Sequence, residues 1–276
     1  AMAQTSETIQ TGKINIMNPA NSILFLGTCA ANFSPLLQNR FKNCFDKNAR
    51  RSSCVLINGR YLIDCGIHCM ESIAIAGVNT DAITDLFLTH THADHFIAQH
   101  AEMLAEKKAR PLNVWCRRDC TLPPIPNTKI IHMDFGKEYA VGEGDSVFAV
   151  DANHDETSFP QHYVFDLHGK KLMYACDGGW VLTRSYNRLK KAELDMLVLD
   201  ATCGDYEGDY RIAEHNSIPM IRLMLPSFKK NGIINDDTKI YLSHIAPSLH
   251  KPHDEIQADV AKDGLIVAHD GLTVQL

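Results

Sequence analysis

Three histidines and one aspartate lie within six residues in the run HTHADH, at residues 90–95. His90 and His92 stand two positions apart, so in an extended segment their rings point the same way and can hold one ion. Asp94 and His95 follow at once and can reach a second ion. Imidazole and carboxylate ligands mixed in this way suit Zn²⁺, Mn²⁺ or Fe²⁺. The run therefore predicts a metal site.

This run needs a strand before it and a helix after it to hold it in place. Residues 85–89 have the pattern of a short buried strand, and residues 96–107 have that of a helix. Further strands are predicted at 22–26, 54–57, 61–63, 112–115, 147–151, 162–167, 171–175, 196–200 and 239–242, with two short ones around Asp270-Gly271. Other helices are predicted at 70–77, 215–230 and 253–263, and a proline-rich connection at 121–138. Strands that alternate with helices in both halves favour an α/β fold, with a single domain over residues 21–276.

The composition is that of a globular protein. The 276 residues are 45% hydrophobic and 22% charged, and 27 Lys and Arg against 33 Asp and Glu give a net charge of −6. Such a chain is neither disordered nor fibrous. Its overall field favours neither a nucleic acid nor an anionic membrane as a partner. No stretch approaches the roughly 18 apolar residues of a membrane span.

The N-terminal residues and the cysteines bear on the compartment. Residues 1–20 are a polar extension without the apolar stretch of a signal peptide. Ala1 before Met2 is typical of a cloning remnant, which leaves the native N-terminus open. The nine cysteines include no CxxC motif and favour reduced thiols. We therefore expect a cytoplasmic protein.

The segment THTHADH, together with four later or earlier motifs, resembles the metallo-β-lactamase superfamily. Each of the other motifs stands at the end of a predicted strand, and they are Asp64, His154, Asp177 and His244. The resemblance spans residues 21–276. It implies a metallo-β-lactamase-like four-layer αβ/βα sandwich, in which two mixed β-sheets pack together with helices outside.

The resemblance also implies a dinuclear site. One ion would be held by His90, His92 and His154, the second by Asp94, His95 and His244, and Asp177 would bridge them. Asp64 would orient a ligand. Two divalent ions, Zn²⁺ or Mn²⁺ with Fe²⁺ as a further candidate, lower the pKa of a bridging water and supply hydroxide for hydrolysis.

Three segments resemble a narrower group, the phosphoribosyl cyclic phosphodiesterases of the carbon–phosphorus lyase pathway. These are FLGT at 25–28, DKNARRSSCVLI at 46–57, and EHNS at 214–217, which also resembles the tRNA 3′-processing nucleases. In those enzymes the histidine of the last segment faces the scissile phosphate, so the resemblance places His215 beside Asp94 and Asp64 among the catalytic residues. A phosphodiester needs a proton for its leaving oxygen, which His215 could supply. Arg50, Arg51 and Ser52 would bind the substrate phosphate.

Several functions fit these observations. The leading one is hydrolysis of a small or cyclic phosphate ester. A tRNA 3′-processing ribonuclease is the alternative, but the acidic charge and the lack of a long basic arm make a nucleic-acid partner less expected. A lactonase, thioesterase or β-lactamase-like hydrolase would not need His215, and a metal-binding scaffold would not need the second metal site. A homodimer, and a structural metal on Cys29 and Cys44, stay open.

Overall fold

The structure is a computed structural model of the chain, and it describes residues 21–142, 144–205 and 210–276. The predicted N-terminal extension, residues 1–20, lies outside the described residues. Within the described part, none of the helices has the length and apolar character needed to cross a membrane.

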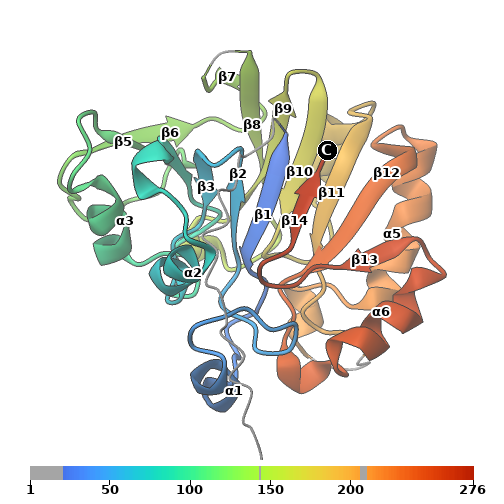
Figure 1. Ribbon diagram of the computed structural model, residues 1–276. Helices are drawn as coiled ribbons and strands as arrows, with labels where there is room; N and C mark the ends of the chain where they lie inside the picture. The colour runs from blue at the N-terminus through green and yellow to red at the C-terminus, as the bar shows by residue number, and fades with distance from the viewer. Residues whose placement is uncertain (1–20, 143, 206–209) are drawn as a thin grey trace, which may run out of the picture.

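Two seven-stranded sheets form the centre of the molecule (Figure 1). The first has the order β14-β1-β2-β3-β4-β5-β6 and the second the order β13-β12-β11-β10-β9-β8-β7. The first sheet consists of β1 (Ser22–Gly27), β2 (Cys54–Ile57), β3 (Tyr61–Ile63), β4 (Asp85–Phe87), β5 (Leu112–Arg117), β6 (Thr128–Met133) and β14 (Thr273–Gln275). The second consists of β7 (Tyr139–Ala140), β8 (Asp145–Asp151), β9 (Gln161–Leu167), β10 (Lys170–Ala175), β11 (Leu194–Asp200), β12 (Ile234–Ser243) and β13 (Leu265–Val267). Both sheets mix parallel and antiparallel pairs.

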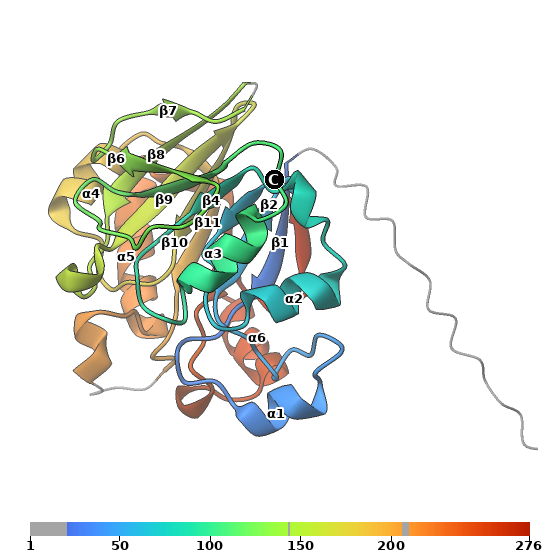
Figure 2. The ribbon, with the colours of Figure 1, turned by 90° about the vertical axis from the view of Figure 1, so that its left-hand side faces the viewer.

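Apolar side chains explain why the two sheets pack together. Phe87 of β4 and Phe165 of β9 meet edge to face with ring centroids 5.0 Å apart, and both rings are fully buried. A second apolar cluster lies under α5 (Ile218–Lys230) and α6 (His253–Ala261), and a third under α2 (Cys69–Ala76) and α3 (Ala98–Ala105). Figure 2 shows α2 and α3 on the outer face of the first sheet. The predicted four-layer sandwich is therefore confirmed.

The remaining helices are short. They are α1 (Pro35–Arg40), α4 (Thr183–Leu189) and the 3₁₀ helices η1 (Thr80–Ala82), η2 (Glu156–Ser158), η3 (Tyr210–Ala213) and η4 (Pro247–Leu249). The chain around α1 lies below the lower edge of the sheets in Figure 1, and the β7–β8 hairpin lies at the opposite, upper end.

The structure corrects two predicted segments and contains helices that the sequence did not predict. Residues 121–138 are not only a connection, because β6 lies within them and pairs in parallel with β5 as an edge strand. α4 was not predicted. The helix expected at 215–230 begins only at Ile218, because the Ser217 hydroxyl caps it by accepting a hydrogen bond from Met220 N.

One edge of the sandwich collects the ends of the strands that carry the metal motifs. β3 and β4 are parallel neighbours in the first sheet, and β10, β11 and β12 are parallel neighbours in the second. β8 is antiparallel to β9, which is antiparallel to β10, so β8 and β10 run the same way. Because these strands end at the same edge, the residues that follow them converge.

Candidate metal centre

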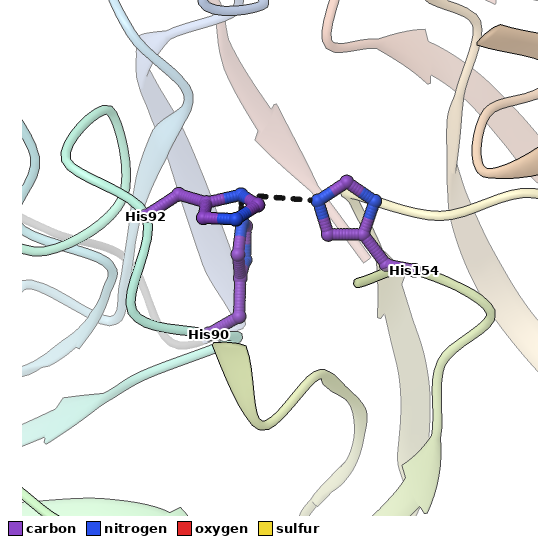
Figure 3. A group of neighbouring side chains, drawn as sticks. All are labelled: His90, His92 and His154. Atoms are coloured by element: carbon purple, nitrogen blue, oxygen red, sulfur yellow. Dashed lines mark hydrogen bonds between the residues drawn. The ribbon is translucent and has the colours of Figure 1, made fainter. Parts of the chain in front are cut away.

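The first cluster consists of three histidines from two loops. His90 and His92 follow β4, and His154 follows β8. His92 Nδ1 lies 3.1 Å from His90 Nε2 and 3.1 Å from His154 Nε2, as Figure 3 shows for the second pair. Ligand atoms about 2.1 Å from one tetrahedral ion are roughly 3.4 Å apart, so these three nitrogens have the spacing of a metal site. The His92 side chain is 40% exposed, which opens the site to solvent at this point.

The second cluster is fully buried and contains Asp94, His95, Asp177 and His244. His95 Nε2 lies 3.2 Å from His244 Nε2 and 3.3 Å from Asp94 Oδ2. These distances again match atoms that share one ion. A set of two imidazoles and two carboxylates suits a borderline divalent cation.

Asp177 lies between the two clusters. Its Oδ2 atom is 3.8 Å from His90 Nε2 and 3.6 Å from His154 Nε2 on one side. On the other side it is 3.7 Å from His95 Nε2 and 3.2 Å from His244 Nε2. One carboxylate oxygen therefore faces four imidazole nitrogens from both groups, which is the place of a bridging ligand.

Gly178 allows the loop after Asp177 to pass close to the ring of His162. Gly178 has φ +157°, and a Cβ there would lie 2.9 Å from His162 Nε2. His162 is buried and its Nε2 donates to the main-chain oxygen of Asp177 at 3.1 Å. The bond holds the main chain of the bridging residue in place.

Asp64 orients His95 from outside the cluster. Its Oδ2 accepts from His95 Nδ1 at 2.7 Å and from the Thr89 hydroxyl at 2.8 Å, and its Oδ1 accepts from Thr89 N at 2.8 Å. The ring therefore turns Nε2 towards the second cluster. Asp64 and His244 both have left-handed backbones, with φ of 66° and 56°, and non-glycine residues adopt that conformation mostly where surrounding structure enforces it.

Asp200, the last residue of β11, is a site residue that the sequence reasoning missed. It is fully buried, and its Oδ2 lies 3.0 Å from His215 Nδ1 and 3.2 Å from His244 Nδ1. Its Oδ1 accepts from Thr202 N and Asn216 N, each at 3.0 Å. Because His244 turns Nδ1 to Asp200 and Nε2 to Asp177, Asp200 is an outer partner of the second cluster. An acidic residue at the end of the apolar run LVLD was the signal that could have revealed it.

The electrostatics of the first cluster favour the neutral form of His90 and His154. Burial lowers the pKa of His90 well below its usual value, and the neighbouring imidazoles lower it further. Burial likewise lowers the pKa of His154. A neutral imidazole has a free lone pair, so both residues are ready to ligate an ion.

In the second cluster, the carboxylates raise the pKa of the imidazoles, and the imidazoles lower the pKa of the carboxylates. Burial alone would lower the pKa of His244, but Asp177 and Asp200 raise it to about 9. Burial alone would raise the pKa of Asp94, but His95 and His244 hold it below its usual range. Without an ion, protonated imidazoles therefore balance the negative charge of the carboxylates. Binding of a metal would release these protons.

The predicted substrate-binding residues have structural contacts instead. Arg50 is buried, and its Nη1 donates to Thr28 Oγ1 and Ala268 O, both at 2.6 Å. Arg51 is also buried, and its Nη2 donates to Glu71 Oε1 at 2.8 Å. The structure thus does not bring the two guanidinium groups to the metal clusters.

Ser52, the third of these residues, is buried beside His68. Its main-chain N donates to His68 Nδ1, and its hydroxyl accepts from His68 N, each at 3.2 Å. A role of this segment in substrate binding stays a prediction. Cys29 and Cys44 differ in burial, Cys29 being buried and Cys44 exposed, and neither belongs to a group of possible metal ligands among the described residues.

Together the fold and the clusters define a protein with the metallo-β-lactamase fold. A family model described as "Anti-Pycsar protein Apyc1" matches residues 22–108, which run from β1 to just beyond α3 and include the HTHADH run. This is less than half of the chain. No curated protein sequence matches the chain.

Solved structures match the chain over most of its length. The metallo-β-lactamase fold protein YhfI from Bacillus subtilis is 13% identical, with 92% of this chain and 98% of that one covered at a TM-score of 0.71. The short form of human tRNase Z is 19% identical, with 92% and 98% covered at a TM-score of 0.63. Zn²⁺-bound PqqB from Methylobacterium extorquens is 16% identical, with 92% and 100% covered at 0.63. At these identities the similarity shows the fold.

Proposed function

We propose that the protein is a dinuclear metal-dependent hydrolase that cleaves the phosphodiester of a small or cyclic phosphate ester. The observation that carries this proposal is the position of Asp177 Oδ2 between a three-histidine cluster and a second cluster of two histidines and a carboxylate. Two divalent ions held there supply Lewis acidity and an activated water. One structural relative, PqqB, has been solved with Zn²⁺ bound, which supports metal binding by a protein of this fold.

The chain's own residues divide the work. His90, His92 and His154 would hold one ion, Asp94, His95 and His244 would hold the other, and Asp177 Oδ2 faces both sets of ligands. Asp64 fixes the ring of His95 and thereby the direction of its lone pair. The exposed edge of His92 marks the side from which a substrate enters.

His215 is the residue that favours a phosphodiester over other esters. Its Nδ1 lies 2.7 Å from Asp177 Oδ1 and 3.0 Å from Asp200 Oδ2, and its ring stacks on that of His244 at 5.6 Å. No described residue bonds to its Nε2, which is left to donate a proton to a leaving oxygen. Burial alone would lower the pKa of His215, but Asp177 and Asp200 raise it to about 12, so the ring carries the proton to be donated.

A ribonuclease of the tRNA 3′-processing type is the second candidate. The similarity in fold to human tRNase Z favours it, while the net charge of −6 counts against tight binding of a polyanion. Binding of precursor tRNA that weakens steeply with salt would separate this function from hydrolysis of a small ester. A lactonase, thioesterase or β-lactamase-like enzyme would work without His215.

Hydrolysis of bis(p-nitrophenyl) phosphate tests the proposal. The protein is stripped of metal and reloaded separately with Zn²⁺, Mn²⁺ or Fe²⁺. We expect metal-dependent turnover that His92→Ala abolishes together with part of the bound metal. His215→Ala should lower turnover and leave the metal content unchanged. No turnover with any metal, despite two bound ions per chain, would contradict the proposal and favour a carbon-ester or thioester hydrolase or a scaffold.

A further inference from the structure

A cavity lies at the edge of the sandwich opposite the metal centre. It has a volume of about 660 Å³ and is lined by the beginning of β4, by the loop before β5, by the β2–β3 turn and by the end of β7. The metal ligands follow the opposite ends of β4 and β8. The β7 end of the molecule is the upper one in Figure 1. The volume lies within the range of pockets that hold small molecules.

The cavity wall carries more cations than anions. Among the described residues, four basic residues line it, namely Arg60, Lys107, Lys108 and Arg110, against the two acids Asp81 and Asp85. The Asp85 carboxylate is already engaged, since its Oδ1 accepts from Trp115 Nε1 at 2.8 Å and from Asn113 Nδ2 at 2.9 Å. A bound anion would meet this excess of positive charge.

None of the four cations takes part in an ion pair with a described residue. Lys108 Nζ donates to the main-chain oxygen of Thr80 at 2.6 Å, which leaves its charge without an anionic partner there. Lys107 and Arg110 are exposed and can turn towards a ligand. Their charges are therefore available to an incoming oxyanion.

Arg60 is held more firmly than a surface arginine. Its guanidinium lies 4.8 Å from the centre of the Tyr61 ring, and its Nε is buried without a hydrogen-bond acceptor among the described residues. The main chain at Gly142 packs directly against the Arg60 guanidinium. A Cβ at this glycine, whose φ is +71°, would lie 3.0 Å from Arg60 Nη1 and 2.6 Å from the Tyr61 hydroxyl. The loop thus packs on a guanidinium whose Nε has no hydrogen-bond acceptor among the described residues.

We propose that this cavity binds a phosphorylated small molecule, with Arg60 as the main contact to the phosphate. A planar guanidinium can donate two parallel hydrogen bonds to a phosphate, and a pre-oriented one loses little entropy on binding. Lys107 and Arg110 add charge at the rim. Trp115, which is 6% exposed, forms part of the wall against which the organic part of the ligand packs. The site is independent of the reaction at the metal centre.

Tryptophan fluorescence tests this site directly. The chain has two tryptophans, Trp115 in the cavity wall and Trp180 elsewhere, so Trp180→Phe leaves one reporter. The metal-loaded variant is titrated at constant ionic strength with ribose 5-phosphate, inorganic phosphate, ribose and citrate. We expect a saturable change with ribose 5-phosphate, weaker binding of inorganic phosphate, and none of ribose or citrate.

Variants in the same background locate the ligand. Arg60→Ala, and separately the exposed pair Lys107→Ala with Arg110→Ala, should each weaken binding roughly tenfold or more, as expected for loss of charged hydrogen bonds. Lys262→Ala, an exposed cation at the end of α6, should leave the affinity unchanged, and so should His92→Ala at the metal centre. The inference is overturned if no phosphate compound saturates the signal, if citrate binds as well as ribose 5-phosphate, or if the cavity variants bind like the parent.

Discussion

Asp200 Oδ2 lies 3.0 Å from His215 Nδ1 and 3.2 Å from His244 Nδ1, so one buried carboxylate serves two imidazoles. His244 turns its other nitrogen to Asp177, and His215 turns its other nitrogen away from the carboxylates. Asp200 therefore couples a candidate metal ligand to the candidate proton donor. This arrangement gives a function to Asp200 through its contacts with these two imidazoles.

The first prediction concerns this carboxylate. Asp200→Asn keeps the shape of the side chain but removes the charge that holds both imidazoles, so we expect turnover to fall about 10- to 100-fold. The measurement is kcat on bis(p-nitrophenyl) phosphate together with metal content. Asp195→Asn, which changes an acid on the same strand that pairs with Lys170, is the control and should retain full activity. Unchanged kcat in the Asp200 variant would contradict the coupling.

The second prediction concerns Asp64. Its carboxylate accepts from His95 Nδ1 at 2.7 Å, so Asp64→Asn should disturb the second cluster and leave the three-histidine cluster intact. We expect affinity for one of the two ions to fall about 10- to 100-fold. Metal analysis after dialysis should give close to one ion per chain in the variant and two in the wild type. Equal loss of both ions would show instead that Asp64 supports the whole site.

The candidate metal ligands could be grouped from the sequence because they come in the order of a known set of motifs, and the structure brings them together. His90, His92, Asp94 and His95 are neighbours in the chain, so their local pattern indicates a metal site, whereas the others were assigned through the resemblance to the order of the family's motifs. Asp200 was missed because its partners lie 15 and 44 residues further on: the pairing of β11 with β12 brings His244 to it, and the loop before α5 brings His215. β6 was missed because prolines precede it and it is a single edge strand.

The third prediction distinguishes a structural role of Arg51 from a role in substrate binding. The sequence indicates a phosphate-binding arginine, but which way a buried side chain points depends on contacts that the sequence does not show. Its guanidinium contacts Glu71 and the main-chain oxygen of Phe41. Arg51→Met should therefore lower the free energy of unfolding by about 2–3 kcal/mol and leave KM unchanged.

Chemical denaturation and steady-state kinetics check this third prediction on the same samples. Arg118→Met, which breaks an exposed pair with Asp134, is the matched control and should cost less than about 1 kcal/mol. A raised KM with normal stability for the Arg51 variant would restore the substrate-binding role.

The fourth prediction is a pH dependence of stability that comes from His253. Burial, and then repulsion from Arg50, lower the pKa of this histidine to about 4. Arg50 Nη2 donates to His253 Nδ1 at 2.9 Å, so that nitrogen must stay unprotonated in the folded protein. The unfolded chain takes up the proton near pH 6.5. Between pH 6.5 and 4 the unfolded state therefore binds more protons, and stability falls as the pH falls.

His253→Asn removes this titration while keeping an acceptor for Arg50 close to the position of Nδ1. The wild type should lose up to about 2 kcal/mol more unfolding free energy than the variant between pH 7 and pH 5. Urea denaturation at several pH values measures the difference, and His132→Asn on the exposed side of β6 serves as the control that should behave like the wild type. Protonation of His253 would place a second cation against the buried guanidinium of Arg50, which is why it should cost stability. Parallel pH profiles for the wild type and His253→Asn would contradict this and would mean that Arg50 moves to another acceptor when His253 is protonated.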